Sequence, residues 1–340
     1  TGSRPFIPPI EGLKGTGFIT NEEVFQLTEL PKNLIVLGAG AIGLELGQSF
    51  ARFGTKVTIV ELADRVLIKE DAEVSALMGK ILCEEGLEIL TKTKAVKANK
   101  NADGKKVLTV ESDGKQTEII ADEILCAVGR QANVENLELE KAGVKFNQKQ
   151  IFTDEYLRTS NKKIFAAGDV TGHFQFTHTA DYEAQHVIQN AFLFYPLTKK
   201  VDFSVMPWAT FAEPEVARVG LTEAEAKAKF GEKVKVFRTE FANNDRANTE
   251  SETVGFAKII TLKGKKILGA SIVGSHAGEL IHEFVLAMRH NLTLADLNSA
   301  IHVYPTFAKI TQALATEQTL ETLKSPLVQK WFQRYLKIWR

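Results

Sequence analysis

A glycine-rich segment, Gly38–Gly43 (GAGAIG), constrains the fold of this 340-residue chain more than any other feature. It follows the apolar run 33–37, and apolar side chains then recur at helical spacing from 43 to 53. A second predicted strand, 56–61, comes after Gly54, a residue type that commonly ends helices. A short apolar run that ends on glycine is typical of a buried parallel strand. The order therefore predicts a strand–helix–strand unit of about 30 residues.

Each glycine of this segment has a separate reason in a dinucleotide-binding turn. Gly38 permits the tight turn, Gly40 lets the backbone approach a pyrophosphate, and Gly43 allows the helix to pack closely on the strand. The helix N-terminus then offers N–H groups and a positive dipole end to the phosphates. The alternative is a glycine-rich turn with a structural role only.

Glu61 ends the second predicted strand, 18 residues beyond Gly43. A carboxylate at that place accepts hydrogen bonds from the adenine-ribose diol and repels a 2′-phosphate. NAD is therefore the expected cofactor. Arg65, four residues further on, keeps NADP open as an alternative.

A second candidate site lies at Gly168 and Asp169, directly after a predicted strand at 164–167. An acidic residue just past a strand end can bind a sugar or polyol hydroxyl. Spacing alone leaves a turn or helix-cap role equally open. A helix is predicted from 179 to 194, with Thr177 or Thr179 as its N-cap.

Composition excludes several classes of protein. The chain has 42 basic and 42 acidic residues, so it lacks the excess charge of a generally basic nucleic-acid binder. It has no run of 18 apolar residues, so no membrane-spanning helix is predicted. Cys83 and Cys126 fit neither a disulfide scaffold nor a zinc site, and no metal site is predicted. We expect a soluble, cytoplasmic α/β protein with two or three domains.

The second half of the chain has a different pattern. A short segment that fits a strand and three alternating segments, followed by two helical patterns, predict an α+β domain with antiparallel strands. The strands are predicted at 208–211, 234–241, 255–261 and 267–273, and the helices at 278–290 and 305–321.

Residues 325–340 predict a basic amphipathic helix that begins with a Ser-Pro pair suited to the N-cap and N1 positions. Its apolar side chains share one face, and basic side chains lie opposite or beside them. Such a helix can lie on an anionic membrane surface as a peripheral contact. The commoner alternative is packing on its own protein or on a dimer mate.

Four motifs follow one another along the chain: Gly38–Gly43 with Glu45, Ala127–Arg130, Ala167–Val170 and Tyr304–Thr306. In this order they resemble the flavin-dependent pyridine nucleotide–disulfide oxidoreductases, and the resemblance covers the whole chain. Residues 176–187, residues 206–226 and Tyr304 look most like the mercuric-reductase-like branch of that family.

This resemblance implies a Rossmann-like NAD domain inserted in a partial FAD domain, plus a C-terminal α+β dimerisation domain. The implied boundaries are 1–27 for an FAD-domain remnant, 28–145 for the NAD(P) domain, 146–200 for the second part of the FAD domain, 201–324 for the dimerisation domain, and 325–340 for the tail helix.

The resemblance also assigns roles to individual residues. Glu45 would face the flavin, Asp169 would bind its ribitol, and Thr177 would lie where a helix N-terminus approaches the isoalloxazine. It assigns Gly2, Arg130, Gly168, Asp169 and Thr177 to FAD, and Gly129, with Gly38, Gly40, Gly43 and Glu61, to NAD.

Two departures from the family pattern concern catalysis. Tyr304 and Lys309 occupy the positions of the histidine and glutamate found in dithiol-handling members. A phenol with a pKa near 10 is a poor general base at neutral pH. The resemblance to the mercuric-reductase-like branch implies that Tyr304 orders or ligates a metal ion or small oxidant. His302 is a further catalytic candidate, although a structural role is the commoner one. The family's first fingerprint and redox cysteine pair would lie upstream of Thr1.

The expected activity is hydride transfer from NAD(P)H through FAD to a disulfide, a metal ion or another acceptor. That acceptor would be a small molecule or a protein disulfide, and the protein would form a homodimer through its C-terminal domain. The alternative is a non-catalytic NAD-binding and dimerisation fragment of such an enzyme.

Overall fold

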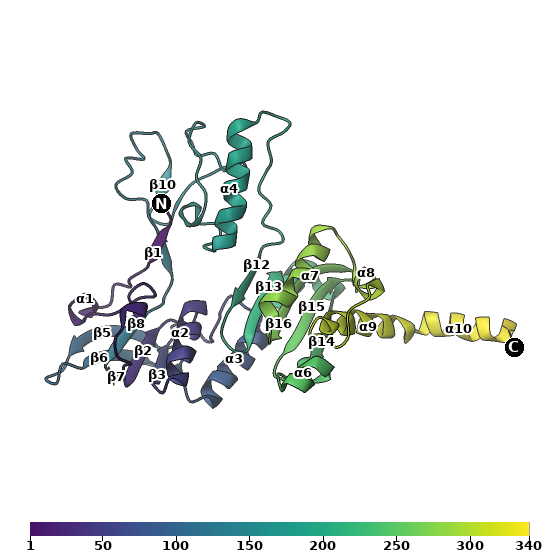
Figure 1. The fold of residues 1–340 in the computed structure, drawn as a ribbon, viewed down its shortest axis with the longest axis horizontal. Helices are drawn as coiled ribbons and strands as arrows, with labels where there is room; N and C mark the ends of the chain where they lie inside the picture. Colours follow the sequence, from purple (N-terminus) through teal and green to yellow (C-terminus); the bar gives the residue numbers. More distant parts are fainter. Residues whose placement is uncertain (340) are drawn as a thin grey trace. The chain divides into compact units, whose positions relative to one another are not determined.

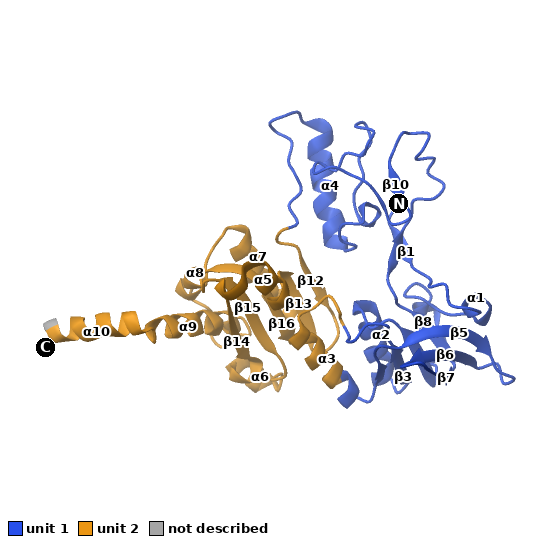
Figure 2. Cartoon of the chain, turned by 180° about the vertical axis from the view of Figure 1, so that it is seen from behind, with its two compact units in different colours: residues 1–66, 82–203 blue, residues 67–81, 204–340 orange. Residues whose placement is uncertain are grey.

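The computed structural model describes residues 1–339, so Arg340, the last basic residue of the predicted tail helix, lies outside it. The chain divides into two compact units (Figure 2). Unit 1 contains residues 1–66 and 82–203, and unit 2 contains residues 67–81 together with the chain from 204 onward. The domain boundaries inferred from sequence remain a prediction.

The predicted strand–helix–strand unit is confirmed in unit 1. Its strands are the centre of a four-stranded parallel sheet in the order β4-β3-β2-β8 (Figure 1). Buried Ile35, Val60 and Ile124 belong to the core cluster of this region. The elements are β2 (Asn33–Leu37), α2 (Ala41–Arg52), β3 (Lys56–Val60), β4 (Glu88–Leu90) and β8 (Glu123–Cys126).

Residues 94–121 form a three-stranded antiparallel sheet of β5 (Lys94–Lys100), β6 (Lys106–Ser112) and β7 (Lys115–Ala121). Asp113 and Gly114 connect β6 to β7 with φ values of 50° and 74°. Asp-Gly is the dipeptide that two-residue turns with two positive φ angles prefer, so the local sequence sets this hairpin.

The remaining elements of unit 1 are short apart from one helix. They are β1 (Ser3–Pro5), α1 (Leu13–Thr16), η1 (Val24–Gln26), β9 (Arg130–Ala132), β10 (Phe146–Asn147), β11 (Gln150–Ile151), η2 (Asp169–Thr171) and α4 (Thr177–Phe192).

Two predictions in this part of the chain were wrong. Residues 164–167 are not a strand: only Phe165 forms a bridge, to Arg158, and the neighbouring amides bond to a local turn at 157–161. The N-cap of α4 is Phe176, and no side chain caps this helix. The ring of Phe176 stacks on that of His178, with ring centroids 5.2 Å apart, so local aromatic packing accompanies a start that threonine capping does not explain.

Unit 2 is built on a five-stranded antiparallel sheet in the order β12-β13-β16-β15-β14. Helix α7 packs on β13 and β16, and α9 packs on β14 and β15. The strands are β12 (Pro207–Thr210), β13 (Glu215–Gly220), β14 (Val234–Glu240), β15 (Phe256–Leu262) and β16 (Lys266–Gly274). The helices are α5 (Glu223–Phe230), η3 (Gly231–Lys233), η4 (Phe241–Asn243), α6 (Asp245–Glu250), α7 (Ala277–Arg289), α8 (Leu294–Ser299), α9 (Lys309–Leu323) and α10 (Pro326–Trp339).

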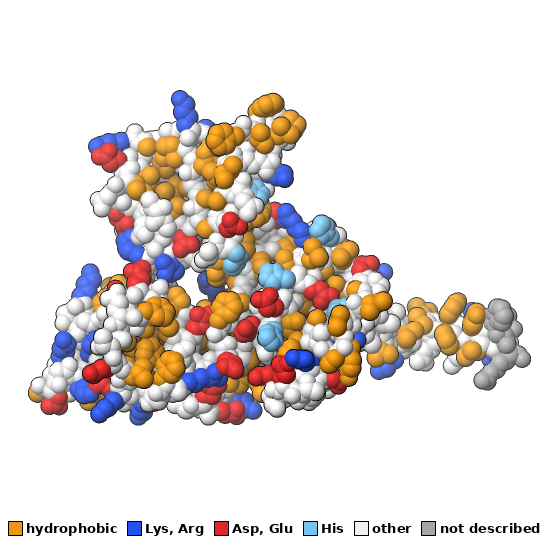
Figure 3. Space-filling view, viewed as in Figure 1, with side chains coloured by type: hydrophobic (Ala, Val, Ile, Leu, Met, Phe, Trp, Pro, Cys, Tyr) orange, Lys and Arg blue, Asp and Glu red, His pale blue; other side chains and the backbone are white. Residues whose placement is uncertain are grey.

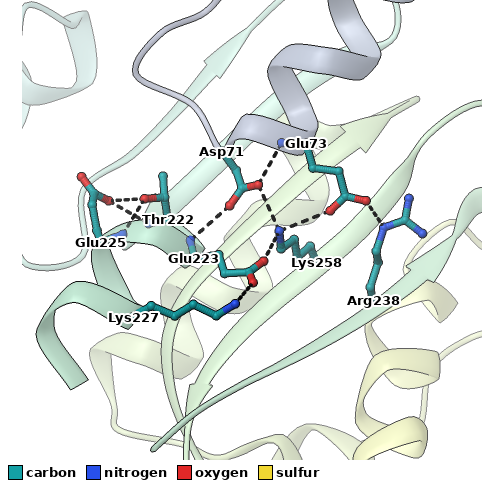
Figure 4. Close-up of polar contacts among 8 residues, drawn as sticks. All are labelled: Asp71, Glu73, Thr222, Glu223, Glu225, Lys227, Arg238 and Lys258. Carbon is teal, nitrogen blue, oxygen red and sulfur yellow. Dashed lines mark hydrogen bonds and ion pairs between the residues drawn. The ribbon is translucent and has the colours of Figure 1, made fainter. Parts of the chain in front are cut away.

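The segment 67–81 joins unit 2 through a cluster of charged side chains (Figure 4). It contains most of helix α3 (Ala72–Glu84). The ammonium group of buried Lys258, on β15, lies 3.0 Å from Asp71, 3.2 Å from Glu73 and 2.5 Å from Glu223. Since Asp71 is also buried, this cluster compensates two charges that would otherwise be unpaired in the interior.

Among residues 1–339, no helix is both long enough and apolar enough to cross a membrane.

Candidate functional site

The predicted dinucleotide loop lies at the carboxyl end of β2. Gly38 has a φ of +98°, a conformation that favours glycine, and its added Cβ would lie 2.7 Å from the carbonyl oxygen of Ala127. Gly40 is the extended N-cap of α2, and no side chain caps the helix. The first-turn N–H groups of α2 are therefore not engaged by a capping side chain, which is the arrangement that phosphate binding requires.

The other two glycines differ in what surrounds them. A Cβ added to Gly43 would lie 2.0 Å from the carbonyl oxygen of Gly38, so helix α2 can meet the loop only without a side chain there. A Cβ added to Gly40 would meet nothing within 4 Å. The glycine at 43 thus serves internal packing, whereas the space in front of Gly40 is open to a ligand.

The carboxylate of Glu61 is held at this loop. One oxygen accepts a hydrogen bond from the Ala39 N–H at 2.7 Å, and the other accepts one from the Ala63 N–H at 2.7 Å. Glu61 therefore organises the glycine loop as well as standing beside it. Both oxygens keep further lone pairs that a ligand hydroxyl could use. The contact of Glu61 with a ribose remains a prediction.

Gly129 lies close to the same sheet edge. The Ala127 N–H donates to the Leu37 carbonyl at 2.8 Å, which brings the end of β8 beside the end of β2. Gly129 is exposed, and a Cβ there would meet nothing within 4 Å. Burial raises the pKa of nearby Cys126 to about 12, so this thiol stays protonated at neutral pH and is a poor nucleophile.

The residues assigned to FAD form a second cluster in unit 1. In the pairing of β1 with β9, Ser3 lies opposite Ala132. The side chain of Arg130, two residues earlier on β9, reaches Ser3, and its Nε donates to the Ser3 hydroxyl at 2.6 Å. The Ser3 hydroxyl in turn donates to Asp169, and the Arg130 Nε lies 3.7 Å from the same carboxylate. Gly2 has a φ of +71°, and its carbonyl oxygen accepts a hydrogen bond from the Asn133 N–H at 3.0 Å. Ser3, the central residue of this cluster, was not among the site residues predicted from the sequence.

Glu183 was also missed, although it fixes the turn that carries Asp169. Its carboxylate is fully buried and accepts the Gly168 N–H at 2.6 Å. It also lies 2.9 Å from Nδ1 of His173 and accepts a hydrogen bond from the Thr171 hydroxyl at 3.3 Å. In the sequence, Thr179 and Glu183 stand four residues apart and so share a helix face, but only the structure shows that this face is buried.

Two further predicted residues lie on helices of unit 1. Thr177 is the exposed first residue of α4, whose first turn contains no acidic residue. Glu45 is half-buried on α2, and its backbone carbonyl accepts the Ser49 hydroxyl at 2.7 Å. The roles of Thr177 and Glu45 toward a flavin remain predictions.

Tyr304 and His302 belong to unit 2. A hydrogen bond to Asp245 and the negative charge of Asp245 raise the pKa of Tyr304, so at neutral pH even less of the phenol is ionised to the phenolate that could act as a base. The Nε2 of His302 lies 2.9 Å from Glu283, and its Nδ1 lies 3.1 Å from the Ala300 carbonyl oxygen. With its side chain 8% exposed, His302 has the surroundings of a structural residue.

A pocket of about 410 Å³ borders Tyr304. Its lining includes the charged residues Asp245, Arg246, Lys309 and Glu317. Burial raises the pKa of Glu317. Within residues 1–339, no three acidic, histidine or cysteine side chains gather in a way that could hold a metal ion.

Comparisons with known proteins identify the family. The model described as "Pyridine nucleotide-disulphide oxidoreductase" matches residues 1–184, and the model of that family's dimerisation domain matches residues 206–315. Mercuric reductase of Staphylococcus aureus is 38% identical over 311 residues, which is 91% of this chain and 56% of the relative. Dihydrolipoyl dehydrogenase of Rhizobium etli is 38% identical over 312 residues, which is 91% of this chain and 64% of the relative.

A solved structure is similar over most of the fold. The Cu(II) complex of the HOCl-induced flavoprotein disulfide reductase RclA from Escherichia coli has a TM-score of 0.85 and 30% sequence identity. The alignment covers 93% of this chain and 71% of RclA. The chain spans less than two thirds of the length of the two curated relatives, mercuric reductase and dihydrolipoyl dehydrogenase.

Proposed function

The chain belongs to the pyridine nucleotide-disulphide oxidoreductase family, and we propose that this protein is an oxidoreductase that transfers hydride from NAD(P)H through FAD to an acceptor. Members of this family are FAD- and NAD(P)H-dependent flavoproteins. Bound FAD would supply the two-electron relay between nicotinamide and acceptor. The match to the family's dimerisation domain supports a homodimer.

The observation that carries the proposal is the glycine loop at the end of β2. Gly40 leaves an open space in front of an uncapped helix N-terminus, and this space fits a pyrophosphate. Glu61 would bind the adenine ribose. Gly129 would border the NAD site without a side chain.

The residues present also fit part of a flavin site. Asp169 would bind the ribitol, with its carboxylate oriented by Ser3 and Arg130 and its turn held by buried Glu183. The uncapped N-terminus of α4 at Thr177 would offer a positive dipole end to a flavin ring that carries negative charge.

For the acceptor, we favour a metal ion or a small oxidant. Tyr304 stands where dithiol-handling relatives place a histidine, and its raised pKa makes it unsuited to take a proton from a thiol at neutral pH. The phenol already donates its proton in a hydrogen bond to Asp245, and the lone pairs of its oxygen remain to order a metal ion or a hydrogen-bond donor. A disulfide acceptor and a non-catalytic NAD-binding and dimerisation fragment are the alternatives.

The absorbance spectrum of the purified chain tests the proposal. We expect the visible bands of bound flavin after gel filtration with FAD, and bleaching of these bands by NADH without oxygen. Asp169→Asn should lose the flavin while it retains NADH binding. An unaltered chain that binds NADH but shows no flavin bands would favour the non-catalytic alternative.

Cofactor preference can be tested at Glu61. Glu61→Gln keeps the size of the side chain and one acceptor for the loop, but removes the charge offered to the ribose. We expect about tenfold weaker NADH binding, because a charged hydrogen bond contributes about 1.5–3 kcal/mol and a neutral one remains. NADPH binding should be unchanged or tighter. Fluorescence titration with both cofactors measures this, and equal losses would contradict the ribose contact.

A further inference from the structure

Helix α10 (Pro326–Trp339) presents an exposed apolar face. In the folded chain, Leu327 is 82% exposed and Trp331 is 63% exposed. Phe332, Tyr335 and Leu336 are between 44% and 50% exposed. Figure 3 shows hydrophobic side chains along this helix. An apolar surface of this kind normally marks an interaction site.

The apolar face is wide. At 3.6 residues per turn, the apolar side chains from Leu327 to Leu336 cover about half of the helix circumference, and glutamine and basic residues cover the rest. A two-stranded coiled coil instead needs a narrow seam of two apolar residues in seven, filled by aliphatic side chains. The bulky aromatic residues Trp331, Phe332 and Tyr335 do not suit that seam.

The charges of this segment have one sign. Lys324, Lys330, Arg334 and Lys337 all follow Glu321, the last acidic residue of the sequence. The ring of Trp331 stacks on that of Tyr335, with centroids 5.6 Å apart. Tryptophan and tyrosine are enriched at the boundary between water and lipid, and basic residues attract anionic headgroups.

We propose that α10 is an interfacial helix that binds the surface of an anionic lipid bilayer. Its apolar face would be buried at the boundary between headgroups and acyl chains, and its basic residues would contact the anionic headgroups. The width of the apolar face, its aromatic residues and the absence of acidic residues after Glu321 fit this partner together. Membrane binding by α10 does not depend on the proposed redox activity. It would hold the protein at the membrane surface without a spanning helix.

Vesicle sedimentation with the full 340-residue chain tests this. We expect the chain to sediment with vesicles of phosphatidylcholine and phosphatidylglycerol at 7:3, and to stay in solution with phosphatidylcholine alone. Raising the salt concentration should release it, because the attraction of basic residues to the surface is screened. Fluorescence of Trp331 should shift to the blue on binding, measured with Trp208 and Trp339 replaced by phenylalanine.

Variants separate the two faces. Lys330→Gln, Arg334→Gln and Lys337→Gln together should weaken binding roughly a hundredfold, since each basic residue contributes about fivefold near an anionic surface. Trp331→Ala with Phe332→Ala removes aromatic side chains from the apolar face and should abolish sedimentation with the anionic vesicles. Gln329→Ala with Gln333→Ala is the control on the polar face and should bind normally.

Three outcomes would overturn the proposal. They are equal binding to neutral and anionic vesicles, unchanged binding of the triple glutamine variant, and absence of binding by the unaltered chain. If Trp331→Ala with Phe332→Ala instead lowered the oligomeric state in solution, the apolar face would belong to a contact between two copies of this chain.

Discussion

Replacing Lys258 by methionine is expected to lower the free energy of unfolding of unit 2 by about 3–5 kcal/mol, because it leaves buried carboxylate charge without a partner. Lys258 is 4% exposed and Asp71 is 5% exposed. The ammonium group bonds to three carboxylates, two of them on the segment 67–81 (Figure 4). Without it, Asp71 and Glu223 would repel each other close to the sheet.

Lys227→Met is the matched control. Lys227 contacts Glu223 at 2.6 Å but is 60% exposed, so its loss should change the free energy of unfolding by less than about 1 kcal/mol. Urea unfolding followed by Trp208 fluorescence, with Trp331 and Trp339 replaced by phenylalanine, measures both variants. Similar losses in the two variants would contradict the importance of the buried cluster.

The pH dependence of this cluster follows from its carboxylates. Burial alone would raise the pKa of Asp71, but hydrogen bonds from Lys258 and from the Glu223 N–H outweigh it and lower that pKa below 3.8. Hydrogen bonds from Lys227 and Lys258 lower the pKa of Glu223 below 4.5. Stabilisation from a lowered pKa is present above the ordinary value and is lost as the pH falls through the lowered one. The difference between the unaltered chain and Lys258→Met should therefore shrink below about pH 4.

Alanine at Gly40 and alanine at Gly43 should differ in their effects on stability but have the same effect on NADH binding. Gly43→Ala forces a Cβ to within 2.0 Å of the Gly38 carbonyl oxygen, which should destabilise the β2–α2 region by roughly 3 kcal/mol. Gly40→Ala meets nothing in the protein and has an extended backbone that alanine adopts, so it should leave stability unchanged or raise it by up to about 1 kcal/mol.

Both substitutions should nevertheless abolish tight NADH binding. In Gly40→Ala the methyl group takes the place of the pyrophosphate, and losing one hydrogen bond to a charged phosphate weakens binding roughly a hundredfold. Hydrogen exchange of the α2 amides measures local stability, and fluorescence titration measures binding. If Gly40→Ala binds NADH normally, the loop is a structural turn without a ligand.

Several features of the fold were predictable from short stretches of sequence. The order of apolar run, glycines and helical pattern between residues 33 and 60 predicted β2, α2 and β3, because backbone geometry and apolar periodicity act locally. The Asp113-Gly114 turn similarly determines its hairpin. In contrast, the apolar run 164–167 indicated burial but could not reveal that its backbone bonds to a turn and not to a strand.

The sequence by itself determined the dinucleotide-binding unit, the family and the amphipathic pattern of the tail, because each depends on the types and spacing of nearby residues. Only the tertiary structure brought Ser3 to Asp169 across 166 residues, buried Glu183 beneath the Gly168 turn, and placed segment 67–81 on the sheet of unit 2. Only the structure showed that the apolar face of α10 is exposed in the folded chain. These features depend on which distant surfaces meet, and the spacing of residues along the chain does not specify that.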